Sequence, residues 1–155
     1  MKHLSVLLLA FIVLATTVQA QTTEKALQNN AAFTGAKAIQ KMYHAIYQLD
    51  KNDPKVIEKT FRNINNALND PRLAGKIQIE LMAFSGGTDA YLKGSKYEND
   101  LKELIQKGVI VAQCNNTLKE RKISREQLYD FIAIVPSGNG ELIIRQAEGW
   151  SVVKP

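Results

Sequence analysis

The run from Gly108 to Thr117 constrains the fold more than any other stretch of the chain. It reads Gly-Val-Ile-Val-Ala-Gln-Cys-Asn-Asn-Thr, so a helix-stopping glycine leads into a short apolar segment that breaks at Cys114. An unbroken apolar run rich in β-branched residues suits a strand buried on both faces, as in a parallel sheet between helices. Cys114 then lies at the carboxyl end of the strand, the edge where open α/β sheets bind ligands.

Strand and helix patterns alternate on either side of this run. The segments with a strand pattern are 41–49, 76–84, 108–114, 131–135 and 150–153. Helical patterns follow Asp53-Pro54, run along Tyr97 to Ile105, open at the capping box Ser124–Gln127 and follow Ser137-Gly138. Between Cys114 and Ser124 we expect a basic loop. The alternation predicts one three-layer α/β/α domain with a mainly parallel five-stranded sheet, of the flavodoxin-like kind.

The N-terminus has the features of a secretory signal peptide. Lys2 and His3 form a basic start, residues 4–15 are almost continuously apolar, and Val-Gln-Ala ends the segment at Ala20. This pattern predicts cleavage before Gln21 and an exported, periplasmic protein. The apolar part is shorter than the ~20 residues of a membrane-spanning helix, so we expect no membrane span after cleavage. A retained anchor is the alternative.

The remaining chain has the size of one domain. Residues 1–20 are expected to be a signal peptide, residues 21–40 a polar leader with one helical turn, and residues 41–155 the α/β domain. The formal charge is +5 at pH 7, but basic residues are interspersed with acidic ones, as at Lys102-Glu103 and Lys119-Glu120. Because they form no basic patch with interleaved aromatic residues, we expect no nucleic-acid partner.

The cysteine and histidine content limits the chemistry. One cysteine cannot form an internal disulfide, so Cys114 is free or pairs between chains. Beyond the signal segment only His44 remains, so we expect no metal site. We also expect no cofactor. His44 lies inside the first predicted strand, away from the Cys114 edge, and we interpret it as structural. No Gly-x-Ser-x-Gly elbow is present, which argues against a serine hydrolase.

Several motifs follow one another at characteristic spacing. After Leu104 come Gly-Val, an apolar strand into Cys-Asn-Asn-Thr-Leu, a second into Val-Pro-Ser-Gly, then Gln-Ala-Glu-Gly-Trp and a closing strand with Lys-Pro. Upstream, Tyr-His-Ala-Ile-Tyr at 43–47 and Asp53-Pro54 fit the same pattern. Over about 110 of 155 residues the chain resembles the DsrE/DsrF-like family, small α/β proteins of the sulfur-relay type.

The resemblance implies a chemistry and an assembly. In some members the cysteine matching Cys114 carries sulfur as a persulfide, which it exchanges with sulfur-donor or acceptor proteins. Members commonly form homo- or hetero-oligomers, often trimers and hexamers, so we expect a homo-oligomer. Those carriers work in the cytoplasm beside partner subunits, whereas this chain has an export signal.

Cys114 is the candidate catalytic residue, since a thiol reacts as thiolate and its pKa falls near amide donors or cations. We expect the loop amides after Cys114 and the cations Lys119, Arg121 and Lys122 to supply both. The candidate substrate-binding residues come from loops that would leave the same sheet edge. They are Asn115, Asn116, Thr117, Ser85, Gly86, Gly87, Ser137 and Gly138.

Each of these assignments has a structural alternative. Cys114 can be a small buried residue that finishes a strand, the Ser85–Gly87 loop a simple strand exit, and Ser137 a helix cap. Two functions therefore stay open, a thiol-based sulfur carrier or redox protein and a non-catalytic oligomeric module that binds a small ligand or protein partner at this edge. Trp150 either contributes to a self-association surface or fills the core.

Overall fold

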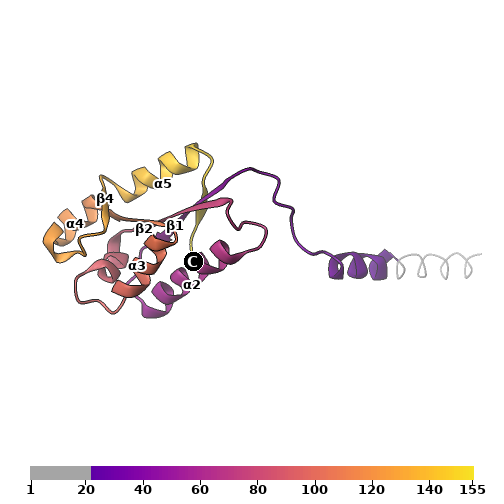
Figure 1. Cartoon of the computed structure of the whole chain (residues 1–155), viewed down its shortest axis with the longest axis horizontal. Coiled ribbons are helices and arrows are strands. Elements are labelled where there is room, and N and C mark those ends of the chain that lie inside the picture. The colour runs from indigo at the N-terminus through magenta and orange to yellow at the C-terminus, as the bar shows by residue number, and fades with distance from the viewer. Residues whose placement is uncertain (1–21) are drawn as a thin grey trace, which may run out of the picture. The chain divides into compact units, whose positions relative to one another are not determined.

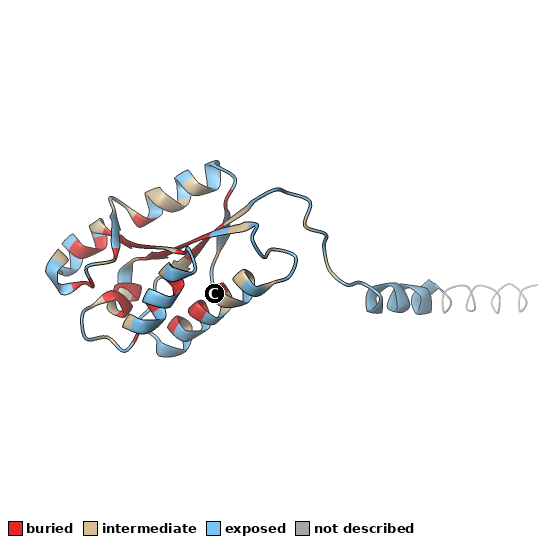
Figure 2. Cartoon of the chain, viewed as in Figure 1, coloured by how far each residue is buried: buried red, intermediate tan, exposed pale blue. Residues whose placement is uncertain are grey.

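The computed structural model describes residues 22–155, so the predicted signal peptide lies outside the described residues. Residues 22–31 form a helix, which is longer than the single turn that we expected. All ten residues are exposed (Figure 2), so no buried face supports this helix, and the run Glu-Lys-Ala-Leu-Gln at its centre consists of good helix formers. The contacts divide the chain into two units between Lys37 and Ala38.

The second unit contains a five-stranded sheet in which every strand pair is parallel. The strands are β1 (Tyr43–Leu49), β2 (Ile77–Ala83), β3 (Ile110–Cys114), β4 (Ala133–Val135) and β5 (Ser151–Val153). Their order across the sheet is β4-β3-β2-β1-β5. The predicted α/β class and parallel sheet are therefore confirmed.

Two helices begin and end where the sequence indicates. Helix α2 (Pro54–Asn69) starts with Pro54 in its first turn, and the Asp53 carboxylate accepts a hydrogen bond from the Lys55 amide at 2.9 Å. Helix α3 (Glu98–Gln106) is followed by Gly108, whose φ of +87° suits glycine.

The segment between β3 and β4 differs from the prediction. Helix α4 (Asn115–Arg121) follows Cys114 directly, where we expected a basic loop. Its only deeply buried side chains are Thr117 and Leu118, so it shows no apolar stripe in the sequence. The capping box at Ser124 forms as predicted but opens only the short 3-10 helix η2 (Arg125–Gln127).

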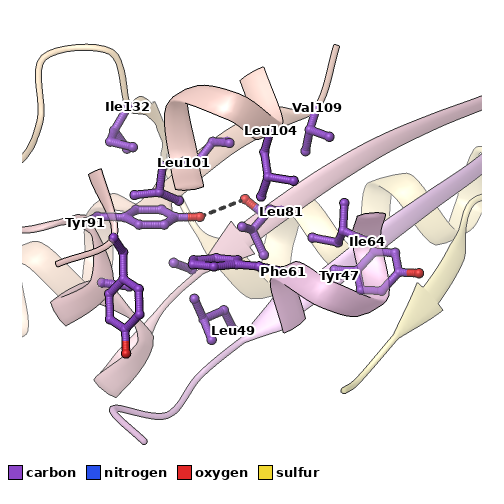
Figure 3. Packing of buried hydrophobic residues seen from close by; sticks show 14 of the residues in the cluster. Tyr47, Leu49, Phe61, Ile64, Leu81, Tyr91, Leu101, Leu104, Val109 and Ile132 are labelled. Carbon is purple, nitrogen blue, oxygen red and sulfur yellow. Dashed lines mark hydrogen bonds between the residues drawn. The ribbon is translucent and has the colours of Figure 1, made fainter. Parts of the chain in front are cut away.

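Helices cover both faces of the sheet (Figure 1). On one face, α2 and α3 pack against residues of β1, β2 and β3, including Tyr47, Leu81 and Val111. This cluster forms the main core (Figure 3), within which the buried Tyr91 hydroxyl donates to the Leu81 carbonyl oxygen at 3.2 Å. Leu118 of α4 packs into the same cluster.

The opposite face is covered by helix α5 (Gly138–Ala147). A smaller buried cluster lies there and consists of Ile46, Met82, Ala112, Cys114 and Trp150. Trp150 is 7% exposed and packs beside His44, with ring centroids 5.0 Å apart. Trp150 therefore fills the core, and the alternative in which it offers an exposed surface is wrong.

A buried ion pair ties α5 to the sheet. The Glu80 carboxylate on β2 is 1% exposed and accepts a hydrogen bond from Arg145 Nε of α5 at 2.9 Å. The Arg145 guanidinium also lies over the Trp150 ring, 4.2 Å from its centroid. Burial raises the pKa of Glu80, while the attraction of Arg145 opposes that rise. This pair anchors α5, including its first turn, to the central strand β2.

Candidate functional site

The strand order places a crevice between the carboxyl ends of β3 and β4. After β3 the chain turns into α4, whose Leu118 packs with the main core, whereas after β4 it turns into α5 on the opposite face. Ligand sites of open α/β sheets form where neighbouring strand exits diverge in this way. A cavity of ≈150 Å³ lies there, lined by Phe84, Ser85, Cys114, Asn116, Thr117, Glu120, Ser137 and Asn139.

The Cys114 thiol lies in this cavity and is only 5% exposed. Burial raises the pKa of the Cys114 thiol, but hydrogen bonds to its sulfur from the backbone of Gly138, Thr117 and Asn116 and from the Thr117 side chain lower it. The pKa of Cys114 is consequently below the ordinary value of a cysteine. Because these donors favour the anion, the site suits a thiolate or another anionic sulfur.

The three cations expected to stabilise the thiolate have other surroundings. Lys119 and Lys122 line a separate groove on the other side of α4. Arg121 donates to the Ser85 carbonyl oxygen at 2.9 Å and pairs with Asp89. Hydrogen bonds therefore favour the thiolate, rather than the lysine and arginine charges that we expected.

The Ser85 turn is fixed to α4 from both sides. Its amide donates to Thr117 Oγ1 at 3.0 Å, while its carbonyl accepts from Arg121. Ser85 has a φ of 49°, a left-handed conformation that is uncommon outside glycine. Thr117 thus links the turn to the thiol, since the same hydroxyl contacts the Cys114 sulfur.

Gly86 and Gly87 serve a different contact. A Cβ atom on Gly87 would lie 1.9 Å from the Leu49 carbonyl oxygen, and one on Gly86 would lie 2.8 Å from the Asn52 amide nitrogen. Gly87 therefore lets the 3-10 helix η1 (Ser85–Tyr91) pack against the end of β1, and Gly86 lets it pack against the loop that follows β1. The cavity lining includes Ser85 but neither glycine.

The β4–α5 connection closes the cavity from the opposite side. Ser137 caps α5, its hydroxyl accepting a hydrogen bond from the Gly140 amide at 3.2 Å, as the structural interpretation expected. A Cβ atom on Gly138 would lie 3.2 Å from the Cys114 Cβ, so glycine allows this backbone to approach the thiol. Ser137 lines the cavity, whereas Gly138 donates its amide to the sulfur.

Of the predicted residues, Ser85, Cys114, Asn116, Thr117 and Ser137 meet in one cavity. Asn115 faces the separate groove beside α4. Phe84, Glu120 and Asn139 line the cavity and were missed. Asn116 and Glu120 are four residues apart and share a helix face, a relation that is visible only once 115–121 is recognised as helical.

The buried side chain of Gln113 stabilises the carboxyl end of β3. Gln113 is fully buried, and its Nε2 donates to the Cys114 carbonyl oxygen at 2.9 Å.

Within residues 22–155 there is no group of three or more His, Cys, Asp or Glu side chains arranged to hold a metal. The same range contains no helix with the length and apolar character needed to cross a membrane.

Comparison with known proteins identifies the family. The model of the DsrE/DsrF-like family matches residues 51–155, which is more than half of the chain. This chain belongs to the DsrE/DsrF-like family. Among solved structures, it is similar to MTH1491 from Methanobacterium thermoautotrophicum, a protein of unknown function, with 29% identity and a TM-score of 0.69. That match covers 73% of this chain and 99% of MTH1491. No curated protein matched the chain.

The Thr117 hydroxyl gives a direct test of the thiol environment in this DsrE/DsrF-like site. In Thr117→Val the sulfur loses one donor and the Ser85 amide loses its acceptor, so we expect the pKa of Cys114 to rise. Since the thiolate fraction at neutral pH falls as the pKa rises, alkylation at pH 7 should slow about three- to tenfold. The pH dependence of iodoacetamide alkylation measures the change, and its midpoint should move to higher pH.

Asn116→Ala is the matched control for that measurement. Asn116 contributes its backbone amide to the sulfur, and alanine retains this donor. The alkylation profile of Asn116→Ala should therefore coincide with that of the wild type. Equal profiles for Thr117→Val and wild type would show that the hydroxyl has no part in the acidity of the thiol.

Proposed function

We propose that Cys114 carries sulfane sulfur as a persulfide within a sulfur-relay-type protein. The observation that carries the proposal is the hydrogen-bonded, acidified thiol in a small polar cavity at the β3–β4 crevice. A terminal persulfide sulfur is anionic at neutral pH, so the donors that favour the thiolate also suit the loaded form. Membership of the DsrE/DsrF-like family supports the same class of function.

The proposed loading step transfers one sulfur atom without net oxidation or reduction. The Cys114 thiolate attacks the outer sulfur of a donor persulfide, so that a new S–S bond forms at Cys114 Sγ. The S–S bond of the donor breaks, and the donor leaves as a thiolate that takes up a proton from solvent. Unloading is the same exchange in reverse, with an acceptor thiolate attacking the outer sulfur on Cys114.

Loading can be measured with a polysulfide as the sulfur source. Wild-type protein incubated with polysulfide and then desalted should gain the mass of one sulfur atom, and incubation with a small thiol should remove it. Intact-mass spectrometry reports both changes. A native protein that never gains sulfur, although Cys114 is reduced, contradicts the proposal.

The low exposure of Cys114 favours a second candidate function. The thiol belongs to a buried cluster with Met82 and Trp150, which is also the environment of a structural cysteine. In that case the protein is a non-catalytic oligomeric module, and the cavity binds a small ligand or the end of a protein partner. The two functions differ in whether native Cys114 reacts.

Export is a further part of the proposal, supported by the basic start, short apolar segment and Val-Gln-Ala pattern at residues 1–20. We expect the mature protein to begin at Gln21 and to be recovered from the periplasm. N-terminal sequencing of the purified native protein measures this. A soluble cytoplasmic protein that retains Met1 contradicts it, and any sulfur donor would then be sought in the cytoplasm.

We also propose that the protein self-associates. Helix α5 covers its sheet face while leaving Ile143 and Ile144 69% and 56% exposed. Large aliphatic side chains adjacent on one exposed surface are favourable contacts for a second subunit. Light scattering should therefore give a mass above that of one chain, and a monomer at all micromolar concentrations contradicts self-association.

A further inference from the structure

Helix α4 separates two depressions in the surface. Asn116 and Glu120 face the Cys114 cavity, whereas an open groove of ≈450 Å³ follows the other side of the helix. The groove is lined by Asn115, Leu118, Lys119, Lys122, Ile123, Ser124, Arg125 and Ile134. Three of these side chains are aliphatic, and Ile134 is 37% exposed on the edge strand β4. The groove thus presents an apolar surface beside the thiol site.

Two cations at this groove have no partner within the described chain. The Lys119 and Lys122 ammonium groups form no hydrogen bond or ion pair with any of residues 22–155. Arg125 differs, because its guanidinium donates to the carbonyl oxygens of Tyr129, Asp130 and Ile132. The groove therefore suits an occupant with an apolar surface flanked by acidic groups.

The outer surface of α5 has these properties. Ile143 and Ile144 lie on it, and both are more than half exposed. Glu148 lies within one helical turn of Ile144, and its side chain is 52% exposed, whereas the Glu141 side chain is only 19% exposed. Glu148 pairs with Arg145 through one carboxylate oxygen, which leaves the other able to accept further hydrogen bonds. Groove and helix are thus complementary in polarity and in charge.

We propose that the groove beside α4 receives the outer face of α5 from a second copy of this chain. The contact joins two different surfaces, so copies either close into a ring or pair twice about a two-fold axis. The inference rests on the proposed self-association and is independent of sulfur carriage. Since α4 also forms one wall of the Cys114 cavity, the second copy lies against the helix that lines the thiol site.

Two single substitutions separate the two surfaces. Ile134→Glu places a charge in the groove and Ile143→Glu places one on α5, and each should weaken self-association at least about tenfold. Ile39→Glu is the control, because Ile39 is 83% exposed and lies outside both surfaces. Analytical ultracentrifugation measures the association, and circular dichroism verifies that each variant is folded.

A mixture of the two variants gives the decisive measurement. Each variant retains one intact surface, so the groove of Ile143→Glu should bind the α5 of Ile134→Glu and give a one-to-one complex. The double variant Lys119→Glu/Lys122→Glu leaves the apolar residues intact. It should also associate at least about tenfold more weakly than wild type at low salt, and added salt should strengthen its association, because salt screens the new repulsion.

The outcomes distinguish this inference from the proposed self-association. A wild-type protein that is monomeric overturns both. A wild-type oligomer that neither Ile134→Glu nor Ile143→Glu weakens, or that only one of them weakens, overturns the α4–α5 interface alone. Two weakened variants that form no mixed complex overturn the pairing of groove with helix.

Discussion

We expect the Cys114→Ser variant to take up no sulfur from polysulfide, whereas the wild type gains the mass of one sulfur atom. The variant keeps the cavity and its amide donors but replaces the nucleophilic sulfur by a hydroxyl, which remains protonated at neutral pH. Intact-mass spectrometry after desalting measures the difference, and the expected loss is complete. The substitution changes one atom, so the fold and the assembly should persist.

Stability measurements show whether the chemical interpretation holds. Urea unfolding of Cys114→Ser should give a free energy within about 1 kcal/mol of the wild type, because the cavity provides polar partners for the hydroxyl. Resistance of the native thiol to alkylation, combined with a larger loss of stability, would identify Cys114 as a structural residue. The oligomeric binding module would then replace the sulfur carrier.

We expect Gly87→Ala to have the largest effect on stability. The new Cβ atom would lie 1.9 Å from the Leu49 carbonyl oxygen, a backbone atom that cannot rotate away. Either η1 or the end of β1 must shift, and we expect the free energy of unfolding to fall by about 3 kcal/mol. Chemical denaturation measures this, and the displaced Ser85 turn should also slow the reaction of Cys114.

Gly140→Ala is the matched control for steric crowding. Gly140 lies in the first turn of α5, and a Cβ atom there would approach only the Ser137 side chain, at 3.3 Å. Alanine also favours a helix over glycine, so the free energy of unfolding should change by less than about 1 kcal/mol. Similar stabilities for Gly87→Ala and Gly140→Ala would show that η1 adjusts freely and does not hold the cavity.

The strands and the two main helices could be predicted because their signals are local. The alternating pattern over residues 76–84, the apolar run into Cys114 and the Asp53-Pro54 start of α2 indicate those elements without reference to the rest of the chain. Helix α4 could not be predicted in this way. Its stability depends on tertiary burial of Leu118, which a sequence of charged and polar residues does not indicate.

The location of the site could be predicted from the sequence, whereas most of the contacts within it could not. Because ligand sites of open α/β sheets lie at the carboxyl ends of the strands, we expected Cys114, Ser85 and Ser137 at one edge, and all three line the cavity. The direction of each side chain was not accessible. Arg121 follows Cys114 closely in sequence but is paired with Asp89, while Gly138 supplies a donor from 24 residues away.

The hydrogen bonds to the Cys114 sulfur come from two different helices. Asn116 and Thr117 donate from the first turn of α4, whereas the Gly138 amide belongs to α5, which the Glu80–Arg145 pair holds on the sheet. The pKa of the Cys114 thiol therefore depends on the position of α5. An event that lifts α5 would remove the Gly138 donor, which favours the anion, and would also relieve the burial that disfavours it. The reactivity of Cys114 would therefore report whether α5 is packed against the sheet.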